Sequence, residues 1–337
     1  MSARNALISL SKLLWRDELR RKECIVSFYN AQARFRRLRT SKKEFDFLYP
    51  EESQLDNRFI VSEYYRGNAL YGISRALREY SDYNFKLPVC IEHGVYFGNY
   101  VDEDIVNPCL PGIITFSEVR CEHIRAKANR DAYAIGPYIH YANKVIDDAA
   151  IKELKKQFGK TLVVFPGHSI SESKAPGSSG NDVLKVAAEL HQQGEFETVL
   201  VCLYFNDFSR LRKRVEESGL FHVVCMGNRY DDSFLSRLKT LITLSDYTLS
   251  DAVGTHVGYC VCLNKPHWIV SPMRHEGNES FKAEVGEVES AFSEYGNITC
   301  SQREVVGKYW GLSKIRTPKE LKTFFLECES ILESHNR

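Results

Sequence analysis

The sequence predicts an α/β protein made of two Rossmann-like domains that face each other across a cleft, followed by a C-terminal helix. Three observations favour this fold. Short apolar runs alternate with amphipathic helical segments, the connections between them are short, and the alternation occurs in both halves of the chain. Strands and helices that alternate in this way form a parallel sheet covered on both faces. The 337 residues are enough for two such domains, each with its own core.

The second half of the chain shows the alternation more clearly. Residues 161–165 are apolar and β-branched and end in a Pro-Gly pair, which is typical of a buried parallel strand. Amphipathic helices are expected between the strands because leucine, valine and alanine recur there at helical spacing. The five strands are expected at residues 161–165, 198–204, 221–225, 246–250 and 267–271.

The first half of the chain is less regular. It contains four short runs that resemble strands, at residues 58–62, 88–92, 112–116 and 132–135. A helix is expected near residues 68–80, and a charged helix begins at Ser117. These features predict a second parallel sheet of the same kind.

A charged helical stretch at residues 143–158 indicates the boundary between the two domains. The sequence Thr317-Pro318-Lys319-Glu320 has the form of a capping box with proline at the first helical position, so a final helix should run to about Ser334. The predicted division is 1–150, 151–315 and 316–337.

Composition and charge describe a globular protein. Hydrophobic residues make up 43% and charged residues 26%, and the net charge of +1 gives no overall bias toward nucleic acid. The charge is uneven, because residues 1–43 carry twelve Lys and Arg against three Asp and Glu. Leu7, Leu10 and Leu14 share one helical face there, so this segment either contacts an anionic membrane surface or packs on the first domain. No nucleic-acid-binding motif accompanies the charge.

The cysteines and the apolar runs indicate in which compartment the protein is expected. None of the ten cysteines forms a CxxC pair, so no zinc site is expected. No apolar run approaches the roughly 20 residues that cross a bilayer, and no cleavable signal peptide is recognised. We expect a cytoplasmic protein, which would be peripheral on the inner face of the cytoplasmic membrane if its basic N-terminus binds there.

The strongest candidate for a binding site is the turn after the strand at 246–250. The strand ends at Ser250, and Gly254-Thr255-His256 then opens a helix of small residues. Hydroxyl groups, a glycine that permits close approach and a helix N-terminus together suit a diphosphate. The alternative is an ordinary strand-to-helix turn in which Ser250 and Thr255 only cap the helix.

Residues 247–270 resemble the corresponding part of GT-B glycosyltransferases from capsule and lipopolysaccharide synthesis. In those enzymes a Ser or Asp at a strand end precedes a Gly-Thr-His-type turn, and a Lys-Pro pair, here Lys265-Pro266, enters the next strand. The likeness extends to residues 91–98, 133–138 and 164–169. A more distant similarity is to the polyol-phosphate transferases of teichoic acid synthesis, which also carry a His-Gly turn in the first domain.

The resemblance implies an enzyme that moves a sugar from a nucleotide-activated donor to a polysaccharide or lipid-linked glycan acceptor without a metal ion. The donor is a co-substrate, and no other cofactor is implied. The C-terminal domain would hold the nucleotide sugar and the N-terminal domain the acceptor. The residues implied in binding the donor phosphates are His168, Ser169, Ser250, Gly254, Thr255 and His256. Those implied in contacting the base, often through backbone groups, are Met226, Gly227, Asn228 and Arg229.

The Glu92-His93-Gly94 turn is the candidate for activating the acceptor. A transfer that inverts the sugar needs a general base near the acceptor hydroxyl, and His93 or Glu92 at a strand end can supply it. The alternative is that Gly94 permits a tight turn and His93 bonds the backbone. Whether the reaction inverts or retains the sugar configuration stays open.

Two further motifs are interpreted as coincidental. Asp102-Glu103-Asp104 matches a metal-binding Asp-x-Asp triplet, but such triplets are common on surfaces and this one does not follow a long apolar strand. Glu276 and Glu284 have the Glu-x7-Glu spacing of many retaining GT-B enzymes, but they come after the Lys-Pro strand instead of before it.

Three other functions remain open. Polyol-phosphate transfer from a CDP-linked donor would use the same phosphate site and break a different bond. A sugar-nucleotide epimerase would need acid and base carboxylates in the cleft and no acceptor. A non-catalytic nucleotide-sugar-binding scaffold would bind the donor without turnover.

Overall fold

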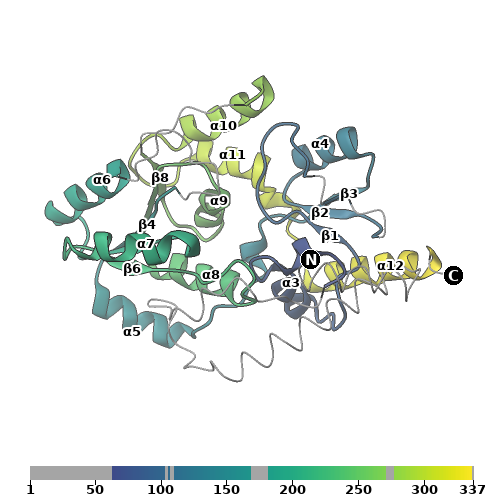
Figure 1. Ribbon diagram of the computed structural model, residues 1–337, viewed down its shortest axis with the longest axis horizontal. Coiled ribbons are helices and arrows are strands. Elements are labelled where there is room, and N and C mark those ends of the chain that lie inside the picture. Colours follow the sequence, from purple (N-terminus) through teal and green to yellow (C-terminus); the bar gives the residue numbers. More distant parts are fainter. Residues whose placement is uncertain (1–62, 103–104, 107–109, 168–180, 271–276, 336–337) are drawn as a thin grey trace, which may run out of the picture.

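The computed structural model describes residues 63–102, 105–106, 110–167, 181–270 and 277–335 (Figure 1). The basic segment 1–43, the strand expected at 58–62, and the predicted site residues His168 and Ser169 lie outside the described residues.

The larger sheet contains five parallel strands in the order β6-β5-β4-β7-β8. The chain lays down β4, β5 and β6 in one direction and then returns to add β7 and β8 beside β4. This order is that of a doubly wound fold, and its switch point lies between β4 and β7. The strands are β4 (Thr161–Phe165), β5 (Thr198–Cys202), β6 (His222–Val224), β7 (Tyr247–Ser250) and β8 (His267–Ile269).

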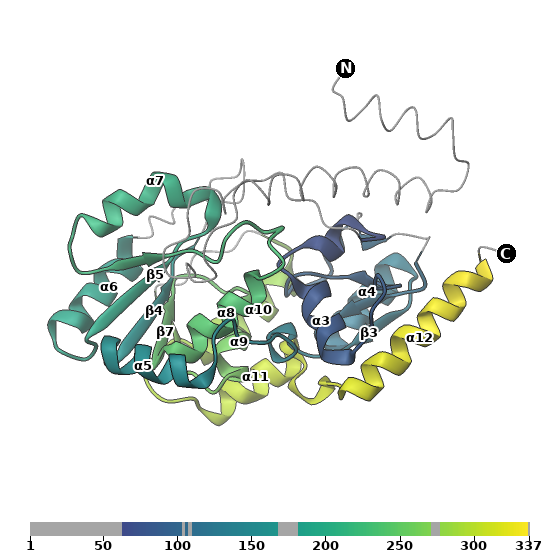
Figure 2. The same ribbon diagram turned by 90° about the horizontal axis from the view of Figure 1, so that it is seen from below.

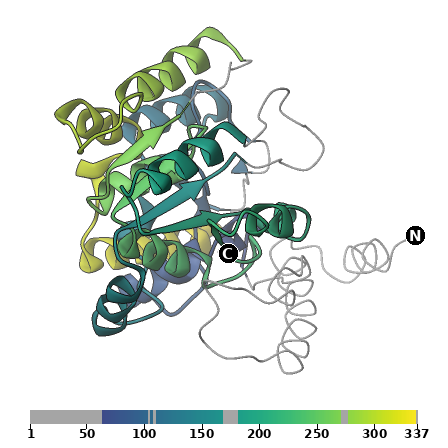
Figure 3. The same cartoon turned by 90° about the vertical axis from the view of Figure 1, so that its left-hand side faces the viewer.

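Helices cover both faces of the larger sheet (Figure 3). Successive side chains of a strand point to opposite faces, so Leu162 and Val164 of β4 pack with α6 and α7, whereas Val163 and Phe165 pack with α8 and α9. The helices of this unit are α5 (Asp148–Phe158), α6 (Asn181–Gln192), α7 (Phe205–Glu216), α8 (Phe234–Leu244) and α9 (Thr255–Cys262). The predicted domain boundary near residue 150 falls within α5.

The smaller sheet has three parallel strands in the order β1-β2-β3 among the described residues. Its helix α4 follows β2 directly, because the Ser117 side chain accepts a hydrogen bond from the Arg120 N–H and caps the helix. The elements of this smaller unit are η2 (Arg66–Ala69), α3 (Ile73–Ser81), β1 (Cys90–Ile91), β2 (Ile113–Thr115), α4 (Glu118–Ala128), β3 (Ala132–Ala134) and η4 (Tyr138–His140).

Two helices that the sequence analysis did not anticipate, α10 (Glu279–Ala291) and α11 (Cys300–Trp310), follow the larger sheet. The turn η5 (Leu312–Lys314) then leads to the predicted final helix, α12 (Pro318–His335). In Figures 1 and 2, α12 lies along the smaller unit. There the buried Phe325 packs on Tyr83 of the smaller unit, with ring centroids 5.4 Å apart.

A single apolar core joins the two units. It includes Ile91 and Phe116 at the smaller sheet and Val163 and Phe165 at the larger one. Trp310 is fully buried in it and packs against Gly258 of α9. The α/β class, the two parallel sheets and the C-terminal helix are therefore confirmed. Within the described part of the chain, no helix combines the length and apolar character that crossing a membrane requires.

Candidate functional site

The loops that follow β1 and β7 meet where the two units face each other. The Val95 N–H, just after β1, donates a hydrogen bond of 3.0 Å to the Thr255 hydroxyl oxygen at the start of α9. A Cβ on Gly94 would lie 3.5 Å from the same oxygen, so the His93-Gly94 turn approaches α9 closely. The two turns singled out in the sequence, 160 positions apart, thus meet in the structure and make up the candidate site.

The α9 helix begins beside the switch point of the larger sheet. Its N-cap residue is Gly254, which has an extended backbone and no side chain to cap the helix. The first N–H groups of an α-helix have no carbonyl partner within it, and they give this end a partial positive charge. Asp251 joins the neighbouring strand ends, because its Oδ1 accepts the Gly167 N–H at 2.5 Å. The turn therefore has the local architecture that binds anions at switch points.

His256 is held over the end of β4. Its ring stacks on Phe165 with centroids 4.8 Å apart. A Cβ on Gly254 would lie 2.8 Å from the His256 imidazole, which is closer than real Cβ atoms approach. Glycine at position 254 is therefore what lets the His256 ring lie across the turn.

The Ser250 side chain, which the resemblance implies in binding a donor phosphate, is directed into the protein interior. Its side chain is fully buried and is hydrogen-bonded to the Ala252 carbonyl and to His267 Nε2, each at 3.0 Å. Burial also holds the pKa of His267 well below its ordinary value, so this imidazole is neutral. The Ser250 hydroxyl thus stabilises the strand end and is not available to a ligand.

His93 lies within the site as a neutral imidazole. Burial lowers its pKa to about 4, the Asp102 carboxylate opposes that shift, and Arg229 adds to it. Its Nε2 is hydrogen-bonded to the Tyr96 hydroxyl at 3.2 Å, and its ring lies 5.7 Å from that of Tyr71. A neutral imidazole has a lone pair that can accept a proton.

Glu92 is directed away from the site, which corrects the expectation that it could act as the base. It is 1% exposed, and its carboxylate accepts hydrogen bonds from Arg120 at 2.6–2.9 Å and from the Thr115 hydroxyl at 2.6 Å. The Arg120 guanidinium also donates to the Gly98 carbonyl at 3.1 Å. Glu92 and Arg120 together therefore hold the loop that carries His93.

The predicted base loop after β6 has two buried side chains, Met226 and Asn228. The Asn228 Oδ1 accepts the Tyr230 N–H at 2.9 Å, and Gly227 has a φ of +92°, which favours glycine. These features shape a tight loop that is largely buried.

Arg229 brings a positive charge to the smaller unit. Its guanidinium lies 5.1 Å from the Tyr230 ring centroid and acts on the pKa values of His93, Tyr71 and Tyr204. The resemblance implies that Arg229 belongs to the loop at the nucleotide base, and in the structure its positive charge also lowers the pKa of His93.

Tyr71 is the main residue beside His93 that the sequence did not point to. It has a φ of +59°, which is rare for a large side chain and recurs at functional sites. Its N–H donates to the Arg229 carbonyl at 2.5 Å, its carbonyl accepts the Leu235 N–H, and its hydroxyl is hydrogen-bonded to Tyr204. No local pattern around the Tyr71-Gly72 pair signals that it reaches the other unit.

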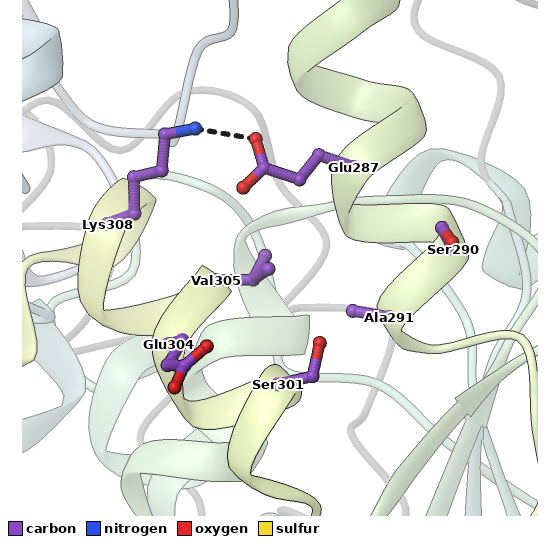
Figure 4. A pocket seen from close by; sticks show the side chains of 7 residues that line it. All are labelled: Glu287, Ser290, Ala291, Ser301, Glu304, Val305 and Lys308. Atoms are coloured by element: carbon purple, nitrogen blue, oxygen red, sulfur yellow. Dashed lines mark hydrogen bonds and ion pairs between the residues drawn. The ribbon is translucent and has the colours of Figure 1, made fainter.

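A separate groove of about 370 Å³ lies between α10 and α11 (Figure 4). The side chains of Lys308 and Glu287 point toward each other across it, with Nζ and Oε2 2.6 Å apart. None of the predicted site residues lines this groove. It is lined by Glu287, Ser290, Ala291, Ser301, Glu304, Val305 and Lys308.

Solved structures match part of the chain at low sequence identity. The wall teichoic acid polymerase TagF matches with a TM-score of 0.42 and 11% identity over 68% of this chain and 59% of its own. The UDP-GlcNAc 2-epimerase from Neisseria meningitidis bound to UDP-GlcNAc matches with a TM-score of 0.35 and 12% identity over 65% of this chain and 60% of its own. The chain thus spans less than two thirds of these proteins. Neither a protein-family model nor a curated protein matches the sequence.

Proposed function

We propose that the chain is a glycosyltransferase that moves a sugar from a nucleotide-activated donor to a hydroxyl group of a glycan acceptor. The observation that carries this proposal is the hydrogen bond between the Val95 N–H and the Thr255 hydroxyl. It brings a neutral imidazole and the positive end of a helix to one place, and group transfer from a diphosphate needs both.

In the proposed reaction, the acceptor oxygen attacks the anomeric carbon of the donor sugar. The bond between that carbon and the phosphate oxygen breaks, and the proton of the acceptor hydroxyl passes to the His93 imidazole. The leaving nucleoside diphosphate takes the electron pair, and its added negative charge is stabilised by the α9 N-terminus, by Thr255 and His256, and by Arg229.

The base and the phosphate groups work from opposite units, so their separation matters. Holding reacting groups within van der Waals contact supplies much of the rate of such reactions. Glu92 and Arg120 serve this purpose in the proposal, because their buried ion pair of 2.6 Å fixes the loop that follows His93. The assignment of the acceptor to surface polysaccharide, either as a free or a lipid-linked glycan, rests on the motif resemblance alone.

The first test is thermal unfolding of the purified protein with UDP, GDP, CMP, CDP and dTDP. A ligand at about 100 times its Kd should raise the Tm by about 5 °C. A response to UDP, GDP or dTDP supports ordinary sugar transfer, and CMP indicates a sugar carried on a monophosphate. A preference for CDP favours polyol-phosphate transfer from a CDP-linked donor. If none of the five nucleotides changes the Tm, the proposed phosphate site is wrong.

The second test separates binding from turnover with the donor that responds. His93→Ala should keep the Tm shift of the nucleotide and lose donor turnover by a factor of at least about 100, the usual contribution of a general base. His222→Ala, at an exposed histidine of β6, is the matched control and should behave as the wild type. Wild-type protein that binds the donor without any hydrolysis or transfer would favour the non-catalytic scaffold.

A further inference from the structure

Glu284, which the sequence analysis set aside, lies between three elements of the structure. Its side chain is 14% exposed. From α10, its Oε2 accepts the Gly98 N–H at 2.6 Å, and its Oε1 is 2.8 Å from His123 Nε2 on α4. One carboxylate of the larger unit therefore holds the loop that follows His93 in the smaller unit.

The loop is shaped to fit against the start of α10. Gly98 has a φ of +64°, and a Cβ at this position would lie 2.8 Å from the backbone nitrogen of Phe281. The neighbouring Asn99 accepts a hydrogen bond of 2.6 Å from the Asn278 side chain, which is the N-cap of α10. Only glycine allows so close an approach of the loop backbone to the helix.

The α10 helix is in turn connected to α9 through α11. Glu287, one turn after Glu284, accepts the Tyr309 hydroxyl hydrogen bond at 2.7 Å. Trp310, the next residue of α11, donates its indole N–H to the Thr255 carbonyl at 3.0 Å. The Thr255 hydroxyl in turn accepts the Val95 N–H, so these contacts lead from α10 through α11 and α9 back to the loop that follows His93.

We propose that Glu284 is a positioning residue that fixes the distance between His93 and the N-terminus of α9. It acts through Gly98, whose N–H it binds while Arg120 of the smaller unit binds the Gly98 carbonyl. The loop from 93 to 100 is thereby held through both the N–H and the carbonyl of Gly98. The consequence for turnover rests on the proposed function, whereas the consequence for the loop does not.

The test uses Glu284→Ala, Glu284→Gln and Gly98→Ala in the full chain. Glu279→Ala is the control, because Glu279 lies on the same helix with its side chain exposed and only a 3.5 Å contact to Lys282. Amide hydrogen exchange of the segment 93–100 is measured in each variant. Loss of a hydrogen bond to a charged acceptor should speed exchange in this segment by about tenfold or more in Glu284→Ala.

Glu284→Gln keeps an oxygen that can accept the Gly98 N–H, so its exchange should stay near that of the wild type and of Glu279→Ala. Gly98→Ala should resemble Glu284→Ala, because the added methyl group forces the loop off α10. Unchanged exchange in both Glu284→Ala and Gly98→Ala would overturn the proposal, whatever the activity of the protein.

The kinetic part of the test uses the donor identified by thermal shift. Glu284→Ala should lower kcat by about tenfold or more while the donor KM changes less than twofold, because the phosphate site on α9 is intact. Equal loss in Glu284→Gln, or a rise in KM alone, would contradict a positioning role. If the protein binds no nucleotide, the proposed function is wrong. The hydrogen-exchange result alone then decides whether Glu284 positions the loop.

Discussion

The neutral state of His93 is the feature on which the proposed chemistry most depends, and it can be tested directly. Its pKa of about 4 lies below the ordinary 6.5, mainly because the imidazole is buried. A shift of this size corresponds to about 3 kcal/mol in favour of the neutral ring. Replacing Arg229 by Gln removes a positive charge that lowers the same pKa. The pKa of His93 should therefore rise in this variant and still stay below 6.5, since burial is the larger cause.

The assay is an NMR titration of histidine labelled at Cε1, with His93→Gln used to assign the resonance. A second readout is urea unfolding between pH 4 and 8. Because the folded pKa lies below the unfolded one, the stabilisation from His93 is complete above pH 6.5. It should be lost as the pH falls toward 4, by up to about 3 kcal/mol relative to His93→Gln.

Two results would refute this reasoning. A wild-type pKa of His93 at or above 6.5 would mean that the ring is not desolvated as the structure indicates. An unchanged pKa in Arg229→Gln would mean that the guanidinium does not act on the ring. A bound nucleoside diphosphate should raise the pKa of His93, because its negative charges offset Arg229 and favour the imidazolium. Such a rise would bring the proton acceptor closer to the pH at which a general base works best.

Three further predictions concern the two turns and the core. Thr255→Val removes the hydroxyl that joins the loops, so the free energy of unfolding should fall by about 1–3 kcal/mol in urea titrations, whereas Thr255→Ser should keep most of it. Burial raises the pKa of Glu63 to about 7, so its contribution to stability is present below pH 4.5 and lost as the pH rises through 7. At pH 8 the Glu63→Gln variant should thus be more stable than the wild type by up to about 3 kcal/mol, and below pH 4.5 the two should be equally stable. Equal stability at pH 8 would contradict the raised pKa of Glu63. In Gly258→Ala the added methyl group would overlap the ring of the fully buried Trp310, so the free energy of unfolding should fall by about 1–3 kcal/mol in thermal unfolding. In Gly307→Ala the methyl group meets no neighbouring atom, so the free energy of unfolding should not fall.

The larger sheet could be predicted from sequence because its strands are buried on both faces. Such strands read as continuous β-branched runs, and residues 161–165 match the observed β4 from end to end. The helix α10 gave no comparable signal. Only Val285 and Val288 of α10 are buried, and its other positions are charged, small or partly exposed. A helix with so few core positions has little of the periodicity on which sequence reasoning depends.

The site could be predicted only at the level of its turns. The sequence indicates that strands end near Glu92 and Ser250, but it does not indicate which way either side chain points. Glu92 is turned inward by Arg120, 28 positions later, and Ser250 by His267, 17 positions later. Tyr71 and Arg229 come together from different units, and no spacing rule connects them. Side-chain direction at a strand end is decided by partners that are distant in sequence.

The position of α12 has a consequence for how the chain is made. Its Phe325 is fully buried and packs on Tyr83, which follows α3 of the smaller unit, and its Phe324 packs on Tyr133 of β3, with centroids 4.9 Å apart. A ribosome reaches α12 only after it has translated both sheets. The residues of α3 and β3 that pack on α12 therefore stay uncovered until α12 has been synthesised. The folding of the smaller unit is completed by long-range contacts, which form slowly and expose the nascent chain to aggregation. The smaller sheet, although its strands precede those of the larger sheet in sequence, is thus the one whose packing is completed by the last described helix.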